Sequence, residues 1–293
     1  MTEWVALVNP RAGRRPVSVD EVEEALARAG VRSRVEKVEG IEAMRDAVRA
    51  VAASSARLAV VGGDGTVSLT VDTLLAANSG EPPLVGVLPA GTGCDLLRMF
   101  GIPQDLDAAA RHLHGDADYL LDVACLEGEW GRRRFVNVAQ AGVGAAAAET
   151  APRLPRMLGA TRYSLAFAAR LPRFPACEVT LTGPGWEYRG SALAVIFANA
   201  QFFAGGWNVA PKASIVDGLL DVQVFDATKT EAPGLVPKIV KGVHLGHRSV
   251  RRRNLGAFRL VTDVPWPVEV DGDHLGATPV TGSVDPGAVR LKI

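Results

Sequence analysis

The sequence predicts an α/β domain built on a parallel sheet, followed by a β-rich domain built on an antiparallel sheet. At 293 residues the chain exceeds the size at which one hydrophobic core stops growing, so about two domains are expected. Up to about residue 125, short apolar runs alternate with helical patterns, as in strand–helix–strand units. Beyond that point strand-like segments separated by Gly and Pro dominate. We therefore expect domains at residues 1–125 and 126–293, although the last strand could return to the first domain.

The first domain shows apolar strands separated by helical patterns. Ser18 and Glu21 form a capping box at the start of a helix that is expected to end at Gly30. Further helices are predicted at 41–53, 68–77 and 95–100. The predicted strands are Trp4–Val8, Arg32–Val38, Leu58–Val61, Leu84–Leu88 and Tyr119–Val123.

The second domain is predicted to contain mainly strands, with one helix at Arg162–Leu171. Tyr163, Phe167 and Leu171 recur on that helix at spacings of four, which indicates packing against the sheet. Alternatively, Tyr163 and Phe167 line an acyl-chain cleft together with Leu154–Leu158. The predicted strands are Phe135–Ala139, Cys177–Thr182, Ala192–Ala198, Leu220–Phe225, Phe258–Thr262, Pro267–Val270 and Val289–Ile293.

Composition excludes several classes of protein. With 32 basic and 32 acidic side chains the net charge is zero, which argues against nucleic-acid binding. Three cysteines without metal-ligand spacing favour a reducing compartment, and no signal peptide is expected, so we predict a cytoplasmic protein. No apolar run is long enough to span a bilayer, so any membrane contact is expected to be peripheral. The basic clusters Arg132–Arg134 and Arg248–Arg253 fit either solvated loops or contacts with anionic headgroups.

The segment Gly62-Gly63-Asp64-Gly65-Thr66 follows a buried strand and precedes a helix. A helix N-terminus at the carboxyl end of a parallel sheet attracts phosphate, and glycines allow positive φ angles and close backbone approach. The acidic Asp64 is unsuited to phosphate itself and suggests a link through Mg²⁺. A tight turn with a solvated aspartate explains the same residues. The spacing fits neither the Walker-A loop nor the Gly-x-Gly-x-x-Gly fingerprint, which disfavours P-loop and Rossmann proteins.

A second strand–turn–helix unit, Leu88-Pro89-Ala90-Gly91-Thr92-Gly93-Cys94-Asp95, repeats this arrangement. If the two strands are neighbours, Asp64 and Asp95 converge on one crevice. Two carboxylates beside a phosphate site imply a metal ion between them. Asp95 alone could equally be the N-cap of the following helix.

In their order along the chain, these motifs resemble those of the diacylglycerol kinase-like lipid kinases, a family that includes sphingosine kinases and bacterial lipid kinases. The resemblance begins at Asn9-Pro10-Arg11-Ala12-Gly13 and continues through both glycine-rich units. In the second domain it covers Phe135–Val138, Gly142–Gly144, Phe197–Asn199, Gly205-Gly206, Ala210–Ala213, Asp217–Asp221, Val268–Asp273 and Thr278-Pro279. It spans nearly the whole chain.

The resemblance implies an ATP- and Mg²⁺-dependent kinase that phosphorylates a hydroxyl of diacylglycerol or a related lipid presented at a membrane surface. It implies an N-terminal three-layer α/β domain, a C-terminal antiparallel β-sandwich-like domain and an active site in the cleft between them. Mg²⁺ would be held by Asp217 with the flanking carbonyls of Ser214 and Leu219. Asp64 and Asp95 would belong to a network of acids, water and metal. The residues lining the nucleotide would be Asn9, Pro10, Gly13, Gly62, Gly63, Asp64, Gly65, Thr66, Ser68, Thr92 and Asp95.

The resemblance also implies that Asp273 is the general base and that Asp271 orients the hydroxyl or supports the metal network, although a plain Asp-Gly β-turn explains Asp271 as well. The family usually has Glu where this chain has Asp273, which sets the proton acceptor back by about 1.5 Å. Cys94 replaces an Asn, Ser68-Leu69 replaces Asn-Glu, and Glu36-Lys37 replaces a Thr expected near the nucleotide.

Two other functions remain open from the sequence. These departures fit a nucleotide- or lipid-binding homologue with impaired phosphate transfer. NAD kinases and phosphofructokinases also use Gly-Gly-Asp-Gly loops, but the segments Asp217–Asp221 and Val270–Asp273 favour the lipid kinases. The sequence leaves open whether the protein forms a homodimer.

Overall fold

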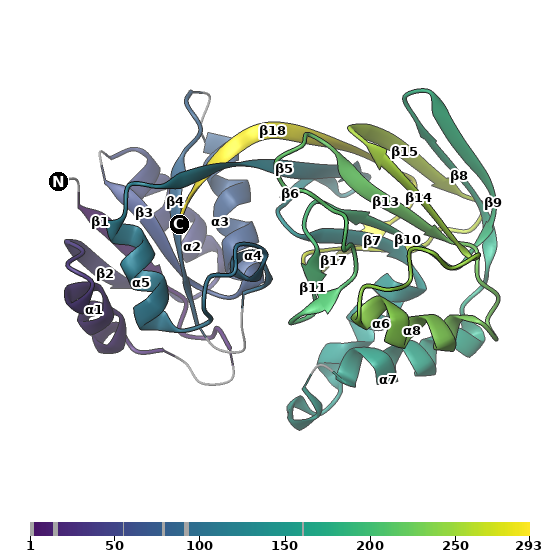
Figure 1. The fold of residues 1–293 in the computed structure, drawn as a ribbon, viewed down its shortest axis with the longest axis horizontal. Coiled ribbons are helices and arrows are strands. Elements are labelled where there is room, and N and C mark those ends of the chain that lie inside the picture. The colour runs from purple at the N-terminus through teal and green to yellow at the C-terminus, as the bar shows by residue number, and fades with distance from the viewer. Residues whose placement is uncertain (1–2, 14–16, 55, 78–79, 91–93, 160) are drawn as a thin grey trace. The chain divides into compact units, whose positions relative to one another are not determined.

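The computed structural model describes residues 3–13, 17–54, 56–77, 80–90, 94–159 and 161–293 (Figure 1). The chain forms two compact units, Met1–Val123 with Pro286–Ile293 and Ala124–Asp285. Two strands, β5 (Asp118–Gly128) and β18 (Val280–Lys292), each begin in one unit and end in the other.

The first unit is built on a parallel sheet with the strand order β2-β1-β3-β4-β18. Its strands are β1 (Trp4–Val8), β2 (Ser33–Lys37), β3 (Arg57–Gly62), β4 (Leu84–Pro89) and the end of β18. All five residues of β1 are buried, because a central strand of a parallel sheet is covered on both faces.

Helices cover both faces of this sheet. They are α1 (Val19–Arg28), α2 (Ile41–Ala52), α3 (Asp64–Ala77), α4 (Asp95–Met99) and α5 (Leu106–His114). The connection from β1 to β2 runs along the sheet in one direction, and those from β2 to β3 and from β3 to β4 run in the other. Right-handed crossovers therefore place α1 on the opposite face from α2 and α3. Accordingly, α1 packs beside α5 and α2 packs beside α3 (Figure 1).

Besides the two-stranded pair β11-β12, the second unit contains two larger antiparallel sheets. One has the order β14-β13-β10-β7-β16-β17, and the other runs β18-β15-β8-β9, with β5 and β6 paired beside β18. The remaining strands of the unit are β6 (Gly131–Phe135), β7 (Val138–Gly142), β8 (Cys177–Gly183), β9 (Trp186–Ala192), β10 (Ala194–Ala198), β11 (Phe202–Phe203), β12 (Trp207–Asn208), β13 (Leu220–Phe225), β14 (Val250–Leu255), β15 (Ala257–Thr262), β16 (Pro267–Val270) and β17 (Asp273–Ala277).

The sheets of the second unit share a core, and helices lie on the outer face of the six-stranded sheet. Phe197 on β10 stacks on Phe258 on β15, with ring centroids 4.0 Å apart. Ile196 points to the other face, toward α6 (Val143–Thr150), α7 (Thr161–Arg170) and α8 (Ala232–Val240). Strand β10 is buried along its whole length because both of its faces are covered. Short 3₁₀ turns occur at Ala151–Arg153, Arg156–Leu158 and Leu171–Arg173.

The predicted fold class, an α/β domain followed by an antiparallel sandwich-like domain, is confirmed. Several predictions about elements were wrong or incomplete, and α5, β9, β14 and β17 were not among the expected elements. Helix α3 begins at Asp64, four residues before the predicted start. The expected strand Phe135–Ala139 is interrupted between β6 and β7. The second unit also contains α6 and α8, where only one helix was expected; glycines in and before α6, and Gly234 and Pro237 inside α8, hid their periodicity.

No helix in the described part of the chain combines the length and apolar character that crossing a membrane requires.

Candidate functional site

In the first unit, the loops after β1 and β3 meet at the carboxyl end of the sheet. The helices that follow these neighbouring strands lie on opposite faces, and ligands of open α/β sheets bind at such a switch point. The side-chain Nδ2 of Asn9 donates a hydrogen bond to Oγ1 of Thr66 at 2.9 Å. The Asn9 side chain also accepts from the backbone N–H of Arg11 at 3.0 Å, which fixes the Asn9 loop. Pro10 in that loop is half-buried, and Gly13 adopts a φ of 74°.

Only Gly63 separates β3 from α3. A Cβ added at Gly62 would lie 2.6 Å from the Cβ of Thr66, so only glycine lets that threonine pack against the strand end. A Cβ at the exposed Gly65 would meet no described atom within 4 Å. The expected positive φ angles are absent at Gly62 and Gly65, so that part of the prediction was wrong for these two residues. Gly62 is required for close packing against Thr66, whereas Gly65 leaves open space beside the helix.

The first turn of α3 has the properties of an anion site. The backbone N–H groups of Thr66 and Val67 bond to the carbonyl of Gly63, so the helix is regular from its start. The N–H groups ahead of these two in the first helical turn point outward along the helix axis and carry a partial positive charge. Since Gly65 leaves the space beside them open, this end of α3 can accept a phosphate group.

Asp64 supports the start of a different helix. Its Oδ1 accepts from the backbone N–H groups of Asp95 at 2.7 Å and Leu96 at 3.3 Å, and from Sγ of Cys94 at 3.5 Å. Cys94 is the N-cap of α4 and makes no side-chain cap of its own, so Asp64 takes over the capping role. Burial, followed by the nearby Asp64 carboxylate, raises the pKa of the Cys94 thiol well above its ordinary value. Cys94 therefore remains a thiol that can donate to Asp64.

The structure places the other predicted nucleotide residues as follows. Asp95 is 2% exposed and pairs with Nε of Arg98 at 3.4 Å. It is the first residue of α4, and Cys94 is the N-cap of that helix. Ser68 is 1% exposed, within the buried face of α3, and its hydroxyl has no hydrogen-bond partner among the described residues. Thr92 lies outside the described residues.

In the second unit, Asp271 and Gly272 form the two-residue turn between β16 and β17. Both have positive φ, 46° and 94°, as a type I′ hairpin turn requires. The Asp271 carboxylate is 8% exposed and accepts from the backbone N–H groups of Val136, Asn137 and Val138 at 3.0, 3.2 and 2.9 Å. Since a carboxylate offers about four lone-pair positions, these bonds occupy most of its capacity. Asp271 thus fixes the turn against the segment that joins β6 to β7.

Asp273, directly after that turn, has an accessible carboxylate. Its side chain is 57% exposed, and its Oδ2 lies 2.7 Å from a guanidinium nitrogen of Arg133. Arg133 is on β6 and only 12% of its side chain is exposed. The ion pair holds Asp273 in one orientation, and sequence reasoning missed it because 140 residues separate the partners.

A buried polar pair lies beside the same hairpin. Glu269 on β16 and Gln140 on β7 are direct cross-strand partners, and Nε2 of Gln140 donates to Oε2 of Glu269 at 2.7 Å. The other Glu269 oxygen accepts from the backbone N–H of Gly272. Burial raises the pKa of the fully buried Glu269 to about 8, although the bonds from Gln140 and Gly272 act in the opposite direction. Sequence reasoning also missed this pair.

The predicted metal ligands lie in the loop before β13. Oδ1 of Asp217 accepts from the backbone N–H of Leu219 at 3.0 Å, which makes a tight turn, and Asp217 is exposed. Ser214 is half-buried in the same loop. Within the described ranges no three His, Cys, Asp or Glu side chains cluster as metal ligands. The exposed Asp217 carboxylate is an oxygen ligand of the kind that Mg²⁺ prefers, and Mg²⁺ keeps several waters when it binds one or two carboxylates.

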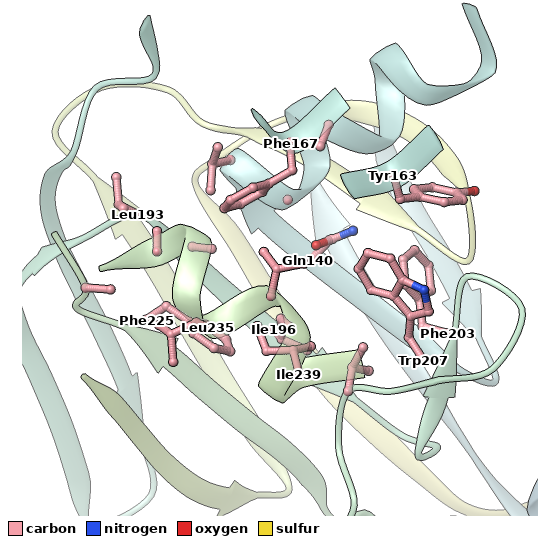
Figure 2. Close-up of a pocket in the computed structure, with 18 of the residues that line it drawn as sticks. Gln140, Tyr163, Phe167, Leu193, Ile196, Phe203, Trp207, Phe225, Leu235 and Ile239 are labelled. Carbon is pink, nitrogen blue, oxygen red and sulfur yellow. The ribbon is translucent and has the colours of Figure 1, made fainter. Parts of the chain in front are cut away.

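An apolar pocket lies between the outer face of the six-stranded sheet and the helices of the second unit (Figure 2). It encloses about 840 Å³ of empty space, part of it open to solvent. Its lining includes Tyr163 and Phe167 from α7, Phe203 and Trp207 from β11 and β12, and Leu235 and Ile239 from α8. Tyr163 and Phe167 thus pack over the sheet and also line this cavity, and the acyl-chain role of the cavity stays a prediction. Among the described side chains of the predicted cleft segment, Leu154, Pro155, Met157 and Leu158, none lines this pocket.

Comparison with known proteins identifies the family. Residues 3–125 match the diacylglycerol kinase catalytic domain, and residues 137–293 match the YegS C-terminal NAD kinase beta sandwich-like domain. The chain belongs to the YegS-like lipid kinases. A relative from Pseudomonas fluorescens, named "Probable lipid kinase YegS-like", is 30% identical over 253 residues, covering 86% of this chain and 82% of the relative. One of that name from Pseudomonas aeruginosa is 30% identical over 262 residues, covering 86% and 81%.

Solved structures share the fold of this lipid kinase. A diacylglycerol kinase from Bacillus anthracis superposes with a TM-score of 0.76 at 19% identity, covering 99% of this chain and 96% of that one. A second structure from the same organism gives a TM-score of 0.80 at 22% identity, with the same coverage. The resemblance stated from the sequence motifs is confirmed.

Proposed function

We propose that this lipid kinase transfers the γ-phosphate of ATP, with Mg²⁺, to a hydroxyl of diacylglycerol or a related lipid. The observation that carries a lipid acceptor is the pocket lined by aromatic and aliphatic side chains in the second unit. Its lining is almost wholly apolar, which suits an acyl chain. Diacylglycerol resides in membranes, and Met157 and Leu165 are exposed apolar side chains, 88% and 49% accessible, which supports peripheral membrane contact.

The proposed nucleotide site is the switch point of the first unit. The first turn of α3 would bind phosphate through its backbone N–H groups, with Gly65 leaving room for it. The hydrogen bond between Asn9 and Thr66 would hold the two loops in position for the nucleotide. Asp64 would act indirectly, by positioning α4.

Mg²⁺ would be held by the carboxylate of Asp217 and the carbonyls of Ser214 and Leu219. When bound, it would neutralise charge on the transferred phosphoryl group. The exposed carboxylate in a turn with carbonyl groups supports this assignment. Asp273 would accept the proton of the lipid hydroxyl, and Arg133 would orient its carboxylate. Asp271 would fix the turn that precedes Asp273.

A transfer assay tests the proposed function. The protein is incubated with γ-labelled ATP, Mg²⁺ and a panel of diacylglycerols, sphingoid bases and other hydroxyl lipids in mixed micelles. We expect label in at least one lipid and loss of transfer when the divalent metal is chelated. Bound ATP without transfer to any lipid would instead identify a nucleotide-binding homologue that has lost activity, and transfer to NAD alone would identify an NAD kinase.

Replacement of the proposed base provides a sharper test. Asp273→Asn keeps the size of the side chain but cannot accept the proton, so we expect kcat to fall roughly 10²- to 10⁴-fold. ATP affinity should stay nearly unchanged, because the nucleotide is assigned to the first unit. The matched control is Asp263→Asn, which changes an exposed aspartate that lies ten residues earlier in the chain and should retain full kcat. Wild-type turnover in Asp273→Asn would remove this residue from the role.

A further inference from the structure

The amide of Gln140 is a polar group inside an apolar pocket. Among the described residues that line the pocket, only Gln140, Tyr163 and Trp207 carry a polar side-chain atom. Figure 2 shows the Gln140 amide in the middle of the lining side chains, whereas the Tyr163 hydroxyl points away from it. A hydrocarbon chain alone would be accommodated better by an aliphatic residue at this position.

Glu269 determines which end of the amide remains available. The two residues face each other across neighbouring antiparallel strands, so their side chains lie on the same face of the sheet. Nε2 of Gln140 donates to Oε2 of the fully buried Glu269 at 2.7 Å. The backbone N–H of Gly272 occupies the other Glu269 oxygen, so the carboxylate is held from both sides. One N–H of the amide nitrogen is thereby held by Glu269, which fixes the orientation of the amide and directs its oxygen elsewhere.

The amide oxygen lacks a donor. No described residue donates a hydrogen bond to Oε1 of Gln140, which is 7% exposed. A Cβ added at Gly144 would lie 2.1 Å from this oxygen, so the missing side chain of Gly144 provides the room that Oε1 occupies. Oε1 is not among the buried unpaired polar atoms of the described residues, so water can reach it through the pocket. A hydrocarbon chain that displaces this water would leave the acceptor unpaired, whereas a ligand that supplies an O–H would pair it.

We propose that Oε1 of Gln140 accepts a hydrogen bond from a hydroxyl carried on the lipid chain, so that the pocket selects hydroxyl-bearing chains over plain hydrocarbon chains. The inference rests on the proposed function, in which this pocket binds the lipid. One oxygen atom makes the selection between chains, and Glu269 and Gly144 position that atom.

Binding of matched fatty acids tests the proposal. The ligands are saturated fatty acids that carry one hydroxyl at successive chain positions, the corresponding keto acids and the unsubstituted acid. Affinities are measured by calorimetry. Quenching of tryptophan fluorescence by brominated acids that is lost in Trp207→Phe verifies that the chain enters the pocket. The pH is kept above about 8, the pKa of Glu269, so that its carboxylate accepts from the amide nitrogen. We expect one hydroxyl position to bind roughly fivefold more tightly than both the keto and the unsubstituted acids.

Two variants assign the preference to Oε1. Gln140→Leu removes the acceptor. Gly144→Ala keeps the amide but displaces its oxygen, so it tests the same acceptor if Gln140→Leu fails to fold. Both should lose the preference for the hydroxy acid and still bind the unsubstituted acid. Three results would overturn the proposal and leave the proposed function standing. They are equal binding of all acids by the wild type, a preference for the keto acid, and a hydroxyl preference that survives in a folded variant. If no acid enters the pocket, the lipid site of the proposed function fails and the proposal fails with it.

Discussion

Asp64 shows why a motif residue has to be placed before a role is assigned to it. Its position inside a glycine-rich segment suggests a metal link, yet its Oδ1 bonds to the backbone N–H groups at the start of α4. The sequence predicted that Asp64 and Asp95 come close together, and the structure places them so. It could not predict that the contact uses a backbone N–H of Asp95, because capping from a distant segment depends on how β3 and β4 are paired.

Gln140 and Glu269 escaped prediction for a related reason. In β16, Val268 and Val270 alternate with Glu269, a pattern typical of a strand with one face in solvent. Here α6 packs against β16 on the side of Glu269, so the residue that the pattern places in water is fully buried. The alternation of apolar and polar residues predicts which side chains of a strand share a face, but it does not show that a helix covers the second face.

Glu269→Gln should change how stability depends on pH. The pKa of Glu269 is about 8 in the folded protein against an ordinary value of 4.5, so between these values the folded state binds more protons than the unfolded state. Stability should therefore fall as pH rises from about 4.5 to about 8, by an amount on the order of a few kcal/mol. The glutamine does not titrate, so the variant should lose most of this decline, as measured by urea unfolding across the window.

The matched control for that experiment is Glu178→Gln, which removes an exposed carboxylate on β8. It should keep the decline of the wild type. An equally steep decline in Glu269→Gln would assign the pH dependence to a different group.

At the scale of elements, the junction between β3 and α3 is the clearest case in which the position was predicted and the geometry was not. The strand, the glycines and the following helix were all expected, but the helix was expected to begin at Ser68 and begins at Asp64. Gly65 has low helix propensity, which favoured a loop in the sequence interpretation. Tertiary packing overrides that propensity, because Thr66 is buried against Gly62.

Two alanine substitutions separate the structural and binding roles of this junction. Gly62→Ala places a methyl 2.6 Å from the Cβ of Thr66 and should destabilise the protein by roughly 1–3 kcal/mol. Gly65→Ala meets no described atom and replaces a glycine in a helix, so stability should stay the same or rise by up to about 1 kcal/mol. The same methyl narrows the space beside the first turn of α3, so the affinity for ATP should fall.

Thermal unfolding and nucleotide titration of both variants measure these effects. Gly65→Ala with unchanged ATP affinity would contradict the phosphate site at α3. Gly62→Ala with wild-type stability would show that Thr66 can move without cost.

At the scale of the whole molecule, the proposed function divides its ligands between two units with separate cores. The first unit contains the candidate phosphate site, and the second contains the apolar pocket and the Asp271-Gly272 turn. The chain passes between the units along β5 and β18. The sequence predicted this two-part organisation of the fold through its length and through the change near residue 125 from alternating strands and helices to strands separated by Gly and Pro. It could not predict the pocket, whose lining comes from segments as far apart as Val138 and Ile239.

Hydrogen exchange should show this division directly. ATP with Mg²⁺ should slow amide exchange at the Asn9 loop and at the start of α3, whereas a lipid with a single acyl chain should slow exchange in α7, α8 and the β11–β12 hairpin. A ligand at about a hundred times its Kd stabilises the bound state by about 2.7 kcal/mol, so protection can reach about a hundredfold for amides that exchange by local opening. Gly65→Ala should weaken the protection by ATP and keep the protection by lipid. Protection of α7 and α8 by ATP alone would show that the assignment of ligands to the two units is wrong.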